Sequence, residues 1–473
     1  MMTAVVSSNG ITFDIISLPD FTNLTNTANL GNGFFQKIHP ILYILIIYYC
    51  MMKKKNDAID MGGGISNDRH GKIQRRNADP WEARPLADSV LRLIWTERLI
   101  SRAEIARRFK LSRSTVTEIV KDLLQSGFVI ERKRGKSQGG RRPILLEFQD
   151  EIRCILGVDI GATHVNVVLT DLQGRILERR EKIHPVRTDP EGTRTLIFEL
   201  CDACLAAWKE GNGRLLSIGV AVPSPVDPLN PDWISEVVIP NWQGRSELGR
   251  LNRQYNVPVH IDNDANLGAL AEYRWGAGRD VSDLIYIKIA HGIGAGYILR
   301  GEIYRGAGGF AGEMGHMPID SSGEPCVCGL RGCLANYVRA RALEKRAKAL
   351  IDKFPDSVLS DTQPTITAIE DAAIAEDPLA LQIVQETAEY LAIAVAGWCN
   401  LMNPKMVVIG GGFSRIGDLF LKPLRDHVQS FTHKSPVAAA EIKTGELGSE
   451  AVAIGAATLA LEEAFATANF FRN

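Results

Sequence analysis

The sequence predicts an α/β protein in which a small helical module with a β-hairpin precedes a much larger core. Two patterns lead to this prediction. Apolar residues recur at helical spacing through residues 86–123. Further along, apolar strands run into glycine-rich turns near residues 161, 292 and 411. A chain of 473 residues, 45 % of them hydrophobic, is long enough for several domains with substantial cores.

Residues 1–80 differ in composition from the rest and are expected to be a disordered or mis-annotated extension. The native start is expected at Met51, Met52 or Met61. An apolar run at residues 41–49 is much shorter than the roughly 20 residues that a membrane-spanning helix needs. The segment also lacks the charged region and cleavage site of a secretory signal. We therefore expect no membrane role.

Three helices are predicted in the module. The first covers residues 86–97. The second begins at Ser101, an N-cap with a glutamate three positions on, and its predicted inward residues are Ala103, Ile105, Ala106 and Phe109. The third is capped by Ser112 and ends near Gly127. Its predicted buried face is Val116, Ile119, Val120 and Leu123.

Short or basic hydrogen-bonding side chains mark the outward start of the third helix. They are Ser112, Arg113, Ser114, Thr115 and Thr117. Predicted strands at 128–132 and 143–148 flank a basic turn that includes Arg141 and Arg142. Residues 102–142 hold twelve Lys or Arg against four Asp or Glu, the local excess that phosphate contacts require. The module resembles the winged helix-turn-helix of bacterial regulators, which implies binding to DNA. A helical bundle with a solvated charged face is the alternative.

A metal-ligand set lies within eighteen positions near the middle of the core. Its members are His316, Cys326, Cys328 and Cys333. Three thiolates and an imidazole favour Zn²⁺, and four protein ligands leave no open position, which indicates a structural site. Glycines at 329 and 332 allow the tight turn. Three buried thiols beside an unrelated histidine are the alternative. Cysteines are too sparse for a disulfide scaffold, which indicates a reducing cytoplasm.

Three glycine-rich turns, each after a predicted strand, are candidate phosphate loops. Their residues are Asp159, Gly161, Thr163, Gly292, Gly294 and Gly411. Glycine allows backbone N–H groups to approach an anion closely. Each turn alone is weak evidence because tight turns after strands are common, but three in order favour phosphate binding.

The core resembles the ROK family of bacterial repressors and sugar kinases. The family signature is met by residues 289–297, Gly306 and residues 312–316. This resemblance implies an actin-like, ribonuclease H-like two-lobed sugar-kinase fold over residues 150–473, with the zinc site and with a winged helix-turn-helix over residues 81–149.

The resemblance also implies a sugar site formed by Asn263, Asp264, Glu313 and His316, with Asp264 as the general base if the protein is a kinase. His316 then has two roles, as a zinc ligand and as a neighbour of the sugar. From the residues alone, the acidic turn before a helix at residues 267–273 is equally well explained as a helix cap.

Three residues depart from the kinase pattern of the family. Ala162 replaces a glycine, His291 replaces a threonine, and Ala335 replaces a sugar-binding glutamate. The first two alter the phosphate loops. The third removes a charged hydrogen bond worth about 1.5–3 kcal/mol, so sugar binding is expected to be weak or the ligand unusual.

These features predict a cytoplasmic transcriptional regulator, expected to be a repressor of carbohydrate genes. A sugar or sugar phosphate effector would bind the core, and a homodimer or dimer of dimers would bind a pseudo-palindromic operator. The alternative is an ATP-dependent sugar kinase with an appended DNA-binding domain. Zn²⁺ is the expected structural metal; ATP and Mg²⁺ are expected only for the kinase.

Overall fold

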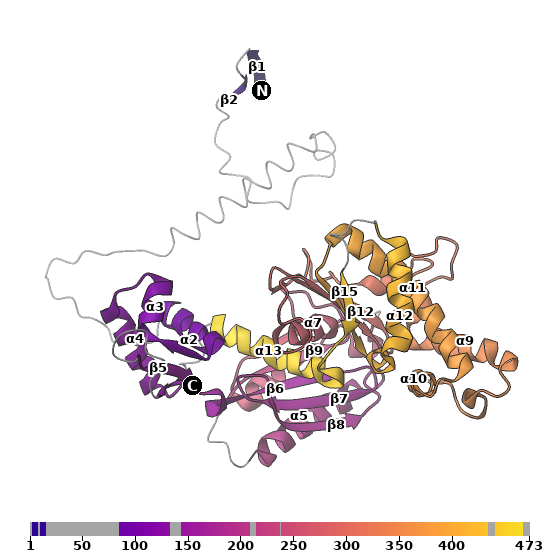
Figure 1. The fold of residues 1–473 in the computed structure, drawn as a ribbon, viewed down its shortest axis with the longest axis horizontal. Coiled ribbons are helices and arrows are strands. Elements are labelled where there is room, and N and C mark those ends of the chain that lie inside the picture. Colours follow the sequence, from indigo (N-terminus) through magenta and orange to yellow (C-terminus); the bar gives the residue numbers. More distant parts are fainter. Residues whose placement is uncertain are drawn as a thin grey trace, which may run out of the picture. The chain divides into compact units, whose positions relative to one another are not determined.

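The computed structural model describes residues 2–7, 10–15, 85–132, 143–208, 214–236, 238–433 and 440–466 (Figure 1). The chain divides into two units, Met1–Ala78 and Asp79–Asn473. In the first unit, strands β1 (Met2–Ser7) and β2 (Gly10–Ile15) pair antiparallel. The expected alternative starts and the apolar run at 41–49 lie outside the described residues.

The second unit begins with three helices and a three-stranded antiparallel sheet. The helices are α2 (Pro85–Glu97), α3 (Arg102–Phe109) and α4 (Arg113–Gln125). The strands, in sheet order, are β3 (Leu99–Ser101), β5 (Leu145–Phe148) and β4 (Val129–Arg132). The buried face of α4 is Val116, Ile119, Val120 and Leu123, as the apolar spacing predicts.

The starts of α3 and α4 are fixed by the predicted caps. Ser101 Oγ and Ser112 Oγ each accept a hydrogen bond from the backbone N–H three positions on, at 3.2 and 3.1 Å. In α3 the predicted inward residue Ile105 is buried, and Ala106 and Phe109 are half-buried against the same cluster. The prediction for Ala103 was wrong, because its side chain is exposed. The strand β3 was also missed, because its pairing partner β5 lies far away in the sequence.

The first lobe of the core contains a five-stranded mixed sheet in the order β10-β9-β6-β7-β8. The strands are β6 (Arg153–Ile160), β7 (His164–Thr170), β8 (Ile176–Ile183), β9 (Arg214–Val222) and β10 (Val259–Asn263). Strand β7 pairs antiparallel with both β6 and β8, whereas β9 pairs parallel with both β6 and β10. Helix α5 (Pro190–Ala207) packs on β7 and β8, and α6 (Gly249–Tyr255) precedes β10.

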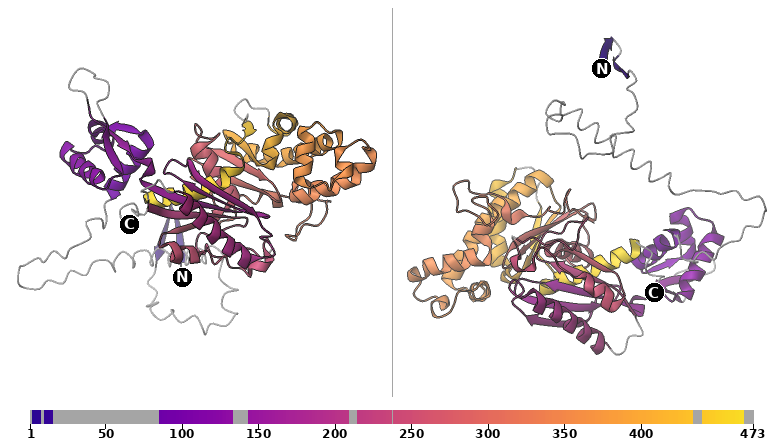
Figure 2. Two further views of the ribbon diagram at one scale, coloured as in Figure 1. Left: turned by 90° about the horizontal axis from the view of Figure 1, so that it is seen from below. Right: turned by 180° about the vertical axis from the view of Figure 1, so that it is seen from behind.

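The second lobe repeats this topology with the strand order β13-β12-β11-β14-β15. Its strands are β11 (Leu284–Ile289), β12 (Ile293–Leu299), β13 (Glu302–Ile303), β14 (Met406–Gly411) and β15 (Glu441–Thr444). Its helices are α8 (Ala335–Val338), α9 (Ala340–Leu350), α10 (Ile366–Ile374), α11 (Pro378–Met402) and α12 (Asp418–Phe431). Three antiparallel strands followed by two parallel ones thus occur twice. Figure 2 shows the ribbon of the protein from two further sides.

Two helices, α7 (Asp264–Trp275) and α13 (Ala451–Ala466), link the lobes. Helix α13 packs on β6 and β9, α7 packs on β11 and β12, and the two helices pack against each other. A Cβ at Gly455 would lie 1.9 Å from the carbonyl oxygen of Leu267, so only glycine permits this close helix packing. Helix α7 begins before the predicted residues 267–273, because Asn263 caps it.

The N-terminal module shares a hydrophobic cluster with α13 and with the end of α7. Trp95 of α2 is 3 % exposed, and its Nε1 donates a hydrogen bond to the carbonyl oxygen of Leu172 at 2.7 Å. Its ring lies edge-on to Trp275, with centroids 6.0 Å apart, and tilted against Phe465 at 5.0 Å. The helix that begins at Asp264 therefore ends against the module.

Among the described helices, α11 alone is long and apolar enough to cross a membrane. Of its most apolar window, 61 % is buried inside the protein. These side chains belong to the main hydrophobic cluster of the second lobe. Core packing therefore accounts for the hydropathy of α11.

Candidate ligand cleft and nucleic-acid interface

A cavity of about 680 Å³ lies between the two lobes. Its lining comes from the β6–β7 turn, the start of α7, the β11–β12 turn, and the segment that runs into α9. Eight predicted site residues line it: Gly161, Thr163, Asn263, Asp264, Gly292, Gly294, Glu313 and His316. Two others, Asp159 and Gly411, are not among the described lining residues. Residues far apart in the sequence thus converge on one cleft.

Asn263 reaches the cavity as the N-cap of α7. Its Oδ1 accepts hydrogen bonds from the backbone N–H groups of Ala265 at 2.9 Å and Asn266 at 3.3 Å. Its Nδ2 donates to the carbonyl oxygen of Ser224 at 3.2 Å. The helix-capping interpretation is therefore confirmed for Asn263, and the same side chain also lines the cleft. Asp264, the first helical residue, is held beside it.

The cysteine-side wall of the cleft consists of Glu313, His316 and Ala335. Glu313 Oε2 lies 3.9 Å from His316 Nε2. Burial, with a smaller contribution from the charge of Asp264, raises the pKa of Glu313. Ala335 opens α8 and leaves a methyl group where the family resemblance implies a carboxylate. Glu313 is therefore an acceptor whose protonated form can also donate to a hydroxyl group.

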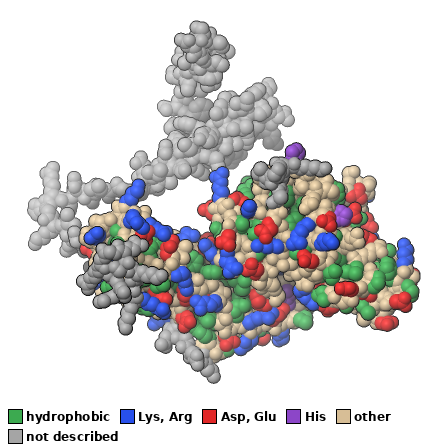
Figure 3. All heavy atoms as spheres, in the orientation of Figure 1, with side chains coloured by type: hydrophobic (Ala, Val, Ile, Leu, Met, Phe, Trp, Pro, Cys, Tyr) green, Lys and Arg blue, Asp and Glu red, His purple; other side chains and the backbone are tan. Residues whose placement is uncertain are grey.

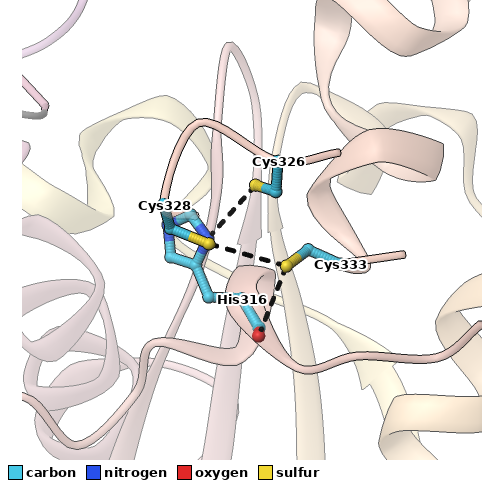
Figure 4. Close-up of side chains that lie close together, drawn as sticks. All are labelled: His316, Cys326, Cys328 and Cys333. Carbon is cyan, nitrogen blue, oxygen red and sulfur yellow. Dashed lines mark hydrogen bonds between the residues drawn. The ribbon is translucent and has the colours of Figure 1, made fainter. Parts of the chain in front are cut away.

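Behind this wall, four metal-ligating side chains point toward one another (Figure 4). The ligand atoms of His316, Cys326, Cys328 and Cys333 all lie within 4.8 Å of one another. The Sγ atoms of Cys328 and Cys333 are 3.7 Å apart. Two thiolates at about 2.3 Å from one tetrahedral Zn²⁺ would be separated by about 3.8 Å, so the spacing fits a metal site.

The two ring nitrogens of His316 face different neighbours, one for each predicted role of this residue. The Nδ1 atom lies 3.6 Å from Cys326 Sγ, whereas Nε2 is directed toward Glu313. Gly329 and Gly332 have φ angles of +91° and +60°, the left-handed conformations that the sequence indicated. A Cβ at Gly332 would lie 1.6 Å from the carbonyl oxygen of Asp320, so this turn requires glycine.

The loop-side wall consists of the turn at residues 161–164, Lys288 and His291. Lys288 Nζ donates a hydrogen bond to Asp264 Oδ2 at 2.8 Å. Sequence reasoning missed Lys288, although a single charged residue near the end of the apolar strand β11 was an available signal. Asp264 therefore interacts with both walls, through this ion pair and through its charge on Glu313.

A histidine also pairs with the buried carboxylate of Asp159. His164 Nε2 lies 3.8 Å from Asp159 Oδ2, and this neighbour raises the pKa of His164 although burial opposes the shift. His291, which replaces a threonine in the family pattern, has a lowered pKa because of burial and the positive charge of Arg187. Imidazole and ammonium groups thus occupy the positions around the expected phosphate loops.

The predicted phosphate glycines do not all lie in loops. Gly294 belongs to β12, and a Cβ at this position would lie 3.4 Å from the Cβ of Ala265, which is an ordinary van der Waals contact. Gly411 ends β14 with φ +77°, and a Cβ there would lie 2.2 Å from the carbonyl oxygen of Ile289. Packing constraints therefore account for glycine at 411 but do not explain it at 294.

The start of α4 presents a polar surface. Ser112, Arg113, Ser114 and Thr117 are exposed and Thr115 is half-buried. Ser112 Oγ also lies 2.7 Å from Ser114 Oγ, so part of this hydroxyl cluster orders the helix start. Figure 3 shows Lys and Arg side chains on the visible surface of the module. The exposed basic residues of its described part include Arg107, Arg108, Lys110, Arg113 and Lys121. The predicted contacts Arg141 and Arg142 lie outside the described residues.

The fold and the cleft define a two-lobed, sugar-kinase-like protein that carries a helix-turn-helix module. Residues 155–463 match the model of the ROK family, and the chain belongs to this family. Residues 89–137 match the model of the MarR family. The family and fold class predicted from the sequence are thus confirmed.

Three similar proteins illustrate the relationship. The xylose repressor of Caldicellulosiruptor bescii is 32 % identical over 380 residues, which cover 79 % of this chain and 94 % of the relative. The crystal structure of a ROK family transcriptional regulator, a homologue of the E. coli MLC protein, has a TM-score of 0.70 and 26 % identity, covering 82 % of this chain and 98 % of its own. A ROK family glucokinase from Streptomyces griseus, solved with glucose and AMPPNP, has a TM-score of 0.58 and 29 % identity, covering 65 % and 99 %.

Proposed function

We propose that this chain is a cytoplasmic DNA-binding transcriptional regulator, a repressor of carbohydrate genes, whose core binds a sugar effector. The supporting observation is the continuity of α7. This helix begins at Asp264 in the cleft and ends at Trp275, whose ring contacts Trp95 of the N-terminal module. A ligand that moves the start of α7 would therefore shift the module that would bind DNA. The similarity to a xylose repressor supports the same function.

In this proposal, the start of α4 enters the major groove. Arg113, Ser114 and Thr117 contact base edges or phosphates, and Ser112 and Thr115 hold the helix start. Arg141 and Arg142 contact the phosphate backbone. One recognition helix reads few base pairs, so a homodimer or dimer of dimers would bind a pseudo-palindromic operator.

The effector would bind through Asn263, Asp264, Glu313 and His316. Amide, carboxylate and imidazole groups can pair with the adjacent hydroxyl groups of a sugar, which both donate and accept. The effector weakens operator binding to the extent that it prefers the arrangement of the module with lower DNA affinity. A sugar phosphate is the other ligand class compatible with a kinase-like cleft.

The cysteine cluster would hold a structural Zn²⁺. Three thiolates and His316 Nδ1 complete a tetrahedral site without water, and His316 would then be fixed beside Glu313. The bound metal would order the wall on which these two residues lie. Zinc in this position would make the sugar site rigid and would take part in no chemical step.

A sugar kinase is the second candidate function. Asp264 lies in the cleft at the start of α7, where a base could reach a sugar hydroxyl, and the similarity to the Streptomyces griseus glucokinase supports this reading. Here ATP and Mg²⁺ would be required. A coupled assay of ADP release over hexoses, pentoses and N-acetylhexosamines separates the two functions, because turnover that Asp264→Asn abolishes is expected only of the kinase.

The direct test is a mobility-shift assay of the full chain on its own upstream region, with and without each sugar. We expect a shift that one sugar weakens and that Arg113→Ala reduces at all sugar concentrations. A folded wild-type protein that never shifts this DNA would overturn the proposal.

A second variant tests the α7 connection. Trp275→Phe removes the hydrogen bond from Trp275 Nε1 to Thr458 Oγ1, 2.8 Å long, and part of the contact with Trp95. The sugar response is expected to decrease while sugar affinity, measured by calorimetry, is retained. The matched control is Trp233→Phe, because the Trp233 ring lies elsewhere in the core, tilted against Phe310.

A further inference from the structure

Lys288 is a charged residue of the cleft to which the proposed function gives no role. Its ammonium group donates a hydrogen bond to Asp264 Oδ2 at 2.8 Å, and both side chains are 16 % exposed. The same ammonium interacts electrostatically with Asp159, which is 3 % exposed at the end of β6. Asp159 Oδ1 is buried and has no hydrogen-bond partner among the described residues. Lys288 is therefore the ion-pair partner of Asp264 and a nearby positive charge for Asp159.

A phosphoryl-transfer site uses such carboxylates differently. One helps to hold the Mg²⁺ that bridges the phosphate oxygens, and another accepts the proton of the attacking hydroxyl group. Mg²⁺ requires nearly octahedral oxygen ligands at about 2.0–2.1 Å. In this cleft Asp264 is hydrogen-bonded to an ammonium group, and Asp159 interacts with the same group. The residues present do not fit Mg²⁺ with a nucleotide triphosphate.

We propose that Lys288 is a built-in cation that takes the place of the divalent metal, so that the cleft binds its sugar ligand without metal and without nucleotide. The inference deepens the proposed function and rests on it for the identity of the ligand. Asp264 Oδ1, which makes no hydrogen bond within the described residues, is available to a sugar hydroxyl group.

Lys288 and Asp159 keep their charges over the pH range of a binding experiment. Burial disfavours the ammonium form, but Asp264 and Asp159 outweigh it and raise the pKa of Lys288 above its usual range. Burial likewise disfavours the ionised form of Asp159, but Lys288 and His164 outweigh it and lower the pKa of Asp159. A divalent cation entering here would meet a fixed positive charge at close range. Removal of that charge leaves two carboxylates that attract a cation.

The test measures the binding of Mn²⁺, a paramagnetic substitute for Mg²⁺, to the zinc-loaded full chain by electron paramagnetic resonance. We expect Lys288→Met to bind one Mn²⁺ per chain at least about tenfold more tightly than the wild type. The double variant Lys288→Met/Asp264→Asn is expected to lose this gain. Lys288→Arg retains the cation and is expected to match the wild type. Lys443→Met, which removes a lysine on β15 of the same sheet, is also expected to match the wild type.

Two results would overturn the proposal. One is a wild-type protein that binds one Mn²⁺ per chain and loses it in Asp264→Asn. The other is a Lys288→Met protein with a wild-type circular dichroism spectrum that binds Mn²⁺ no better than Lys443→Met. If Lys288→Met does not fold, the comparison of Mn²⁺ binding between the wild type and Asp264→Asn tests the proposal alone. A failure of the proposed function is recognised separately, as absence of operator binding when no sugar is present.

Discussion

The two walls of the cleft differ in how much of a sugar kinase each retains. On the cysteine-side wall lie Glu313 and His316, and His316 belongs to a cluster of four potential metal ligands. On the loop-side wall, the groups that would face phosphate are an ammonium at Lys288 and imidazoles at His164 and His291. In the proposed function, sugar binding and phosphoryl transfer would depend on different residues of one cleft, so that the second could be lost while the first is retained.

Asp264 belongs to neither wall and interacts with both. It lies at the start of α7, beside the N-cap Asn263, and α7 extends to Trp275 at the N-terminal module. A change at either wall therefore reaches the same helix. The following predictions test whether the two walls behave as differently as their residues indicate.

The largest effect is expected from Cys328→Ala on the cysteine-side wall. The variant should lose its Zn²⁺, and the free energy of unfolding should fall by on the order of 3 kcal/mol or more, because structural Zn²⁺ contributes about 10–16 kcal/mol in small zinc domains. Chemical denaturation and zinc content by mass spectrometry measure this. Cys399→Ala, a buried cysteine of α11 outside the cluster, is the control. If zinc-free Cys328→Ala bound sugar with unchanged affinity, that result would contradict the proposal that the metal orders this wall.

A gain is expected from Ala335→Glu, which places a carboxylate at the start of α8. The cavity of about 680 Å³ leaves room for the longer side chain. A charged hydrogen bond to a sugar hydroxyl contributes about 1.5–3 kcal/mol, so calorimetry should show sugar binding at least about tenfold tighter. Ala335→Gln keeps the size without the charge and should gain less. Weaker binding by both variants would mean that this wall is not the sugar side.

A smaller effect concerns pH and the loop-side wall. Asp159 raises the pKa of His164, against burial and the charge of Lys288, with Glu181 adding to the increase. A histidine with a raised pKa in the folded state stabilises the protein fully below its unfolded pKa of about 6.5 and loses this contribution as pH rises through the folded pKa. The stability difference between wild type and His164→Gln should therefore shrink between about pH 6 and pH 8, measured by urea denaturation. A difference that grows over this range would contradict the pairing.

No catalytic effect is expected from restoring the family's loop residues. The double variant Ala162→Gly/His291→Thr should show no ADP release with any sugar, because Lys288 still engages Asp264. Sugar affinity should change by less than about twofold, since neither residue is on the cysteine-side wall. Measurable turnover would show that the loop-side wall is only two substitutions from a kinase.

Local patterns in the sequence predicted local features of the structure. The buried face of α4, its Ser112 cap and the positive φ angles of Gly329 and Gly332 all follow from neighbouring residues. Contacts between distant segments were not predictable in this way. The ion pair of Lys288 with Asp264 joins β11 to the start of α7, and β3 exists only because β5 returns to it. Trp95 fits a helical apolar face, and only the fold shows that it meets Trp275.

The central claim is that sugar binding in the cleft, without nucleotide, weakens operator binding. Fluorescence anisotropy of labelled upstream DNA, titrated with sugar in the absence of ATP and Mg²⁺, tests it most directly. We predict that one sugar weakens the affinity of the wild type for DNA by at least about fivefold, the lower end of typical allosteric coupling. Asp264→Asn should bind the DNA equally well and give no response. A response that requires ATP and Mg²⁺, or that persists unchanged in Asp264→Asn, would contradict the account.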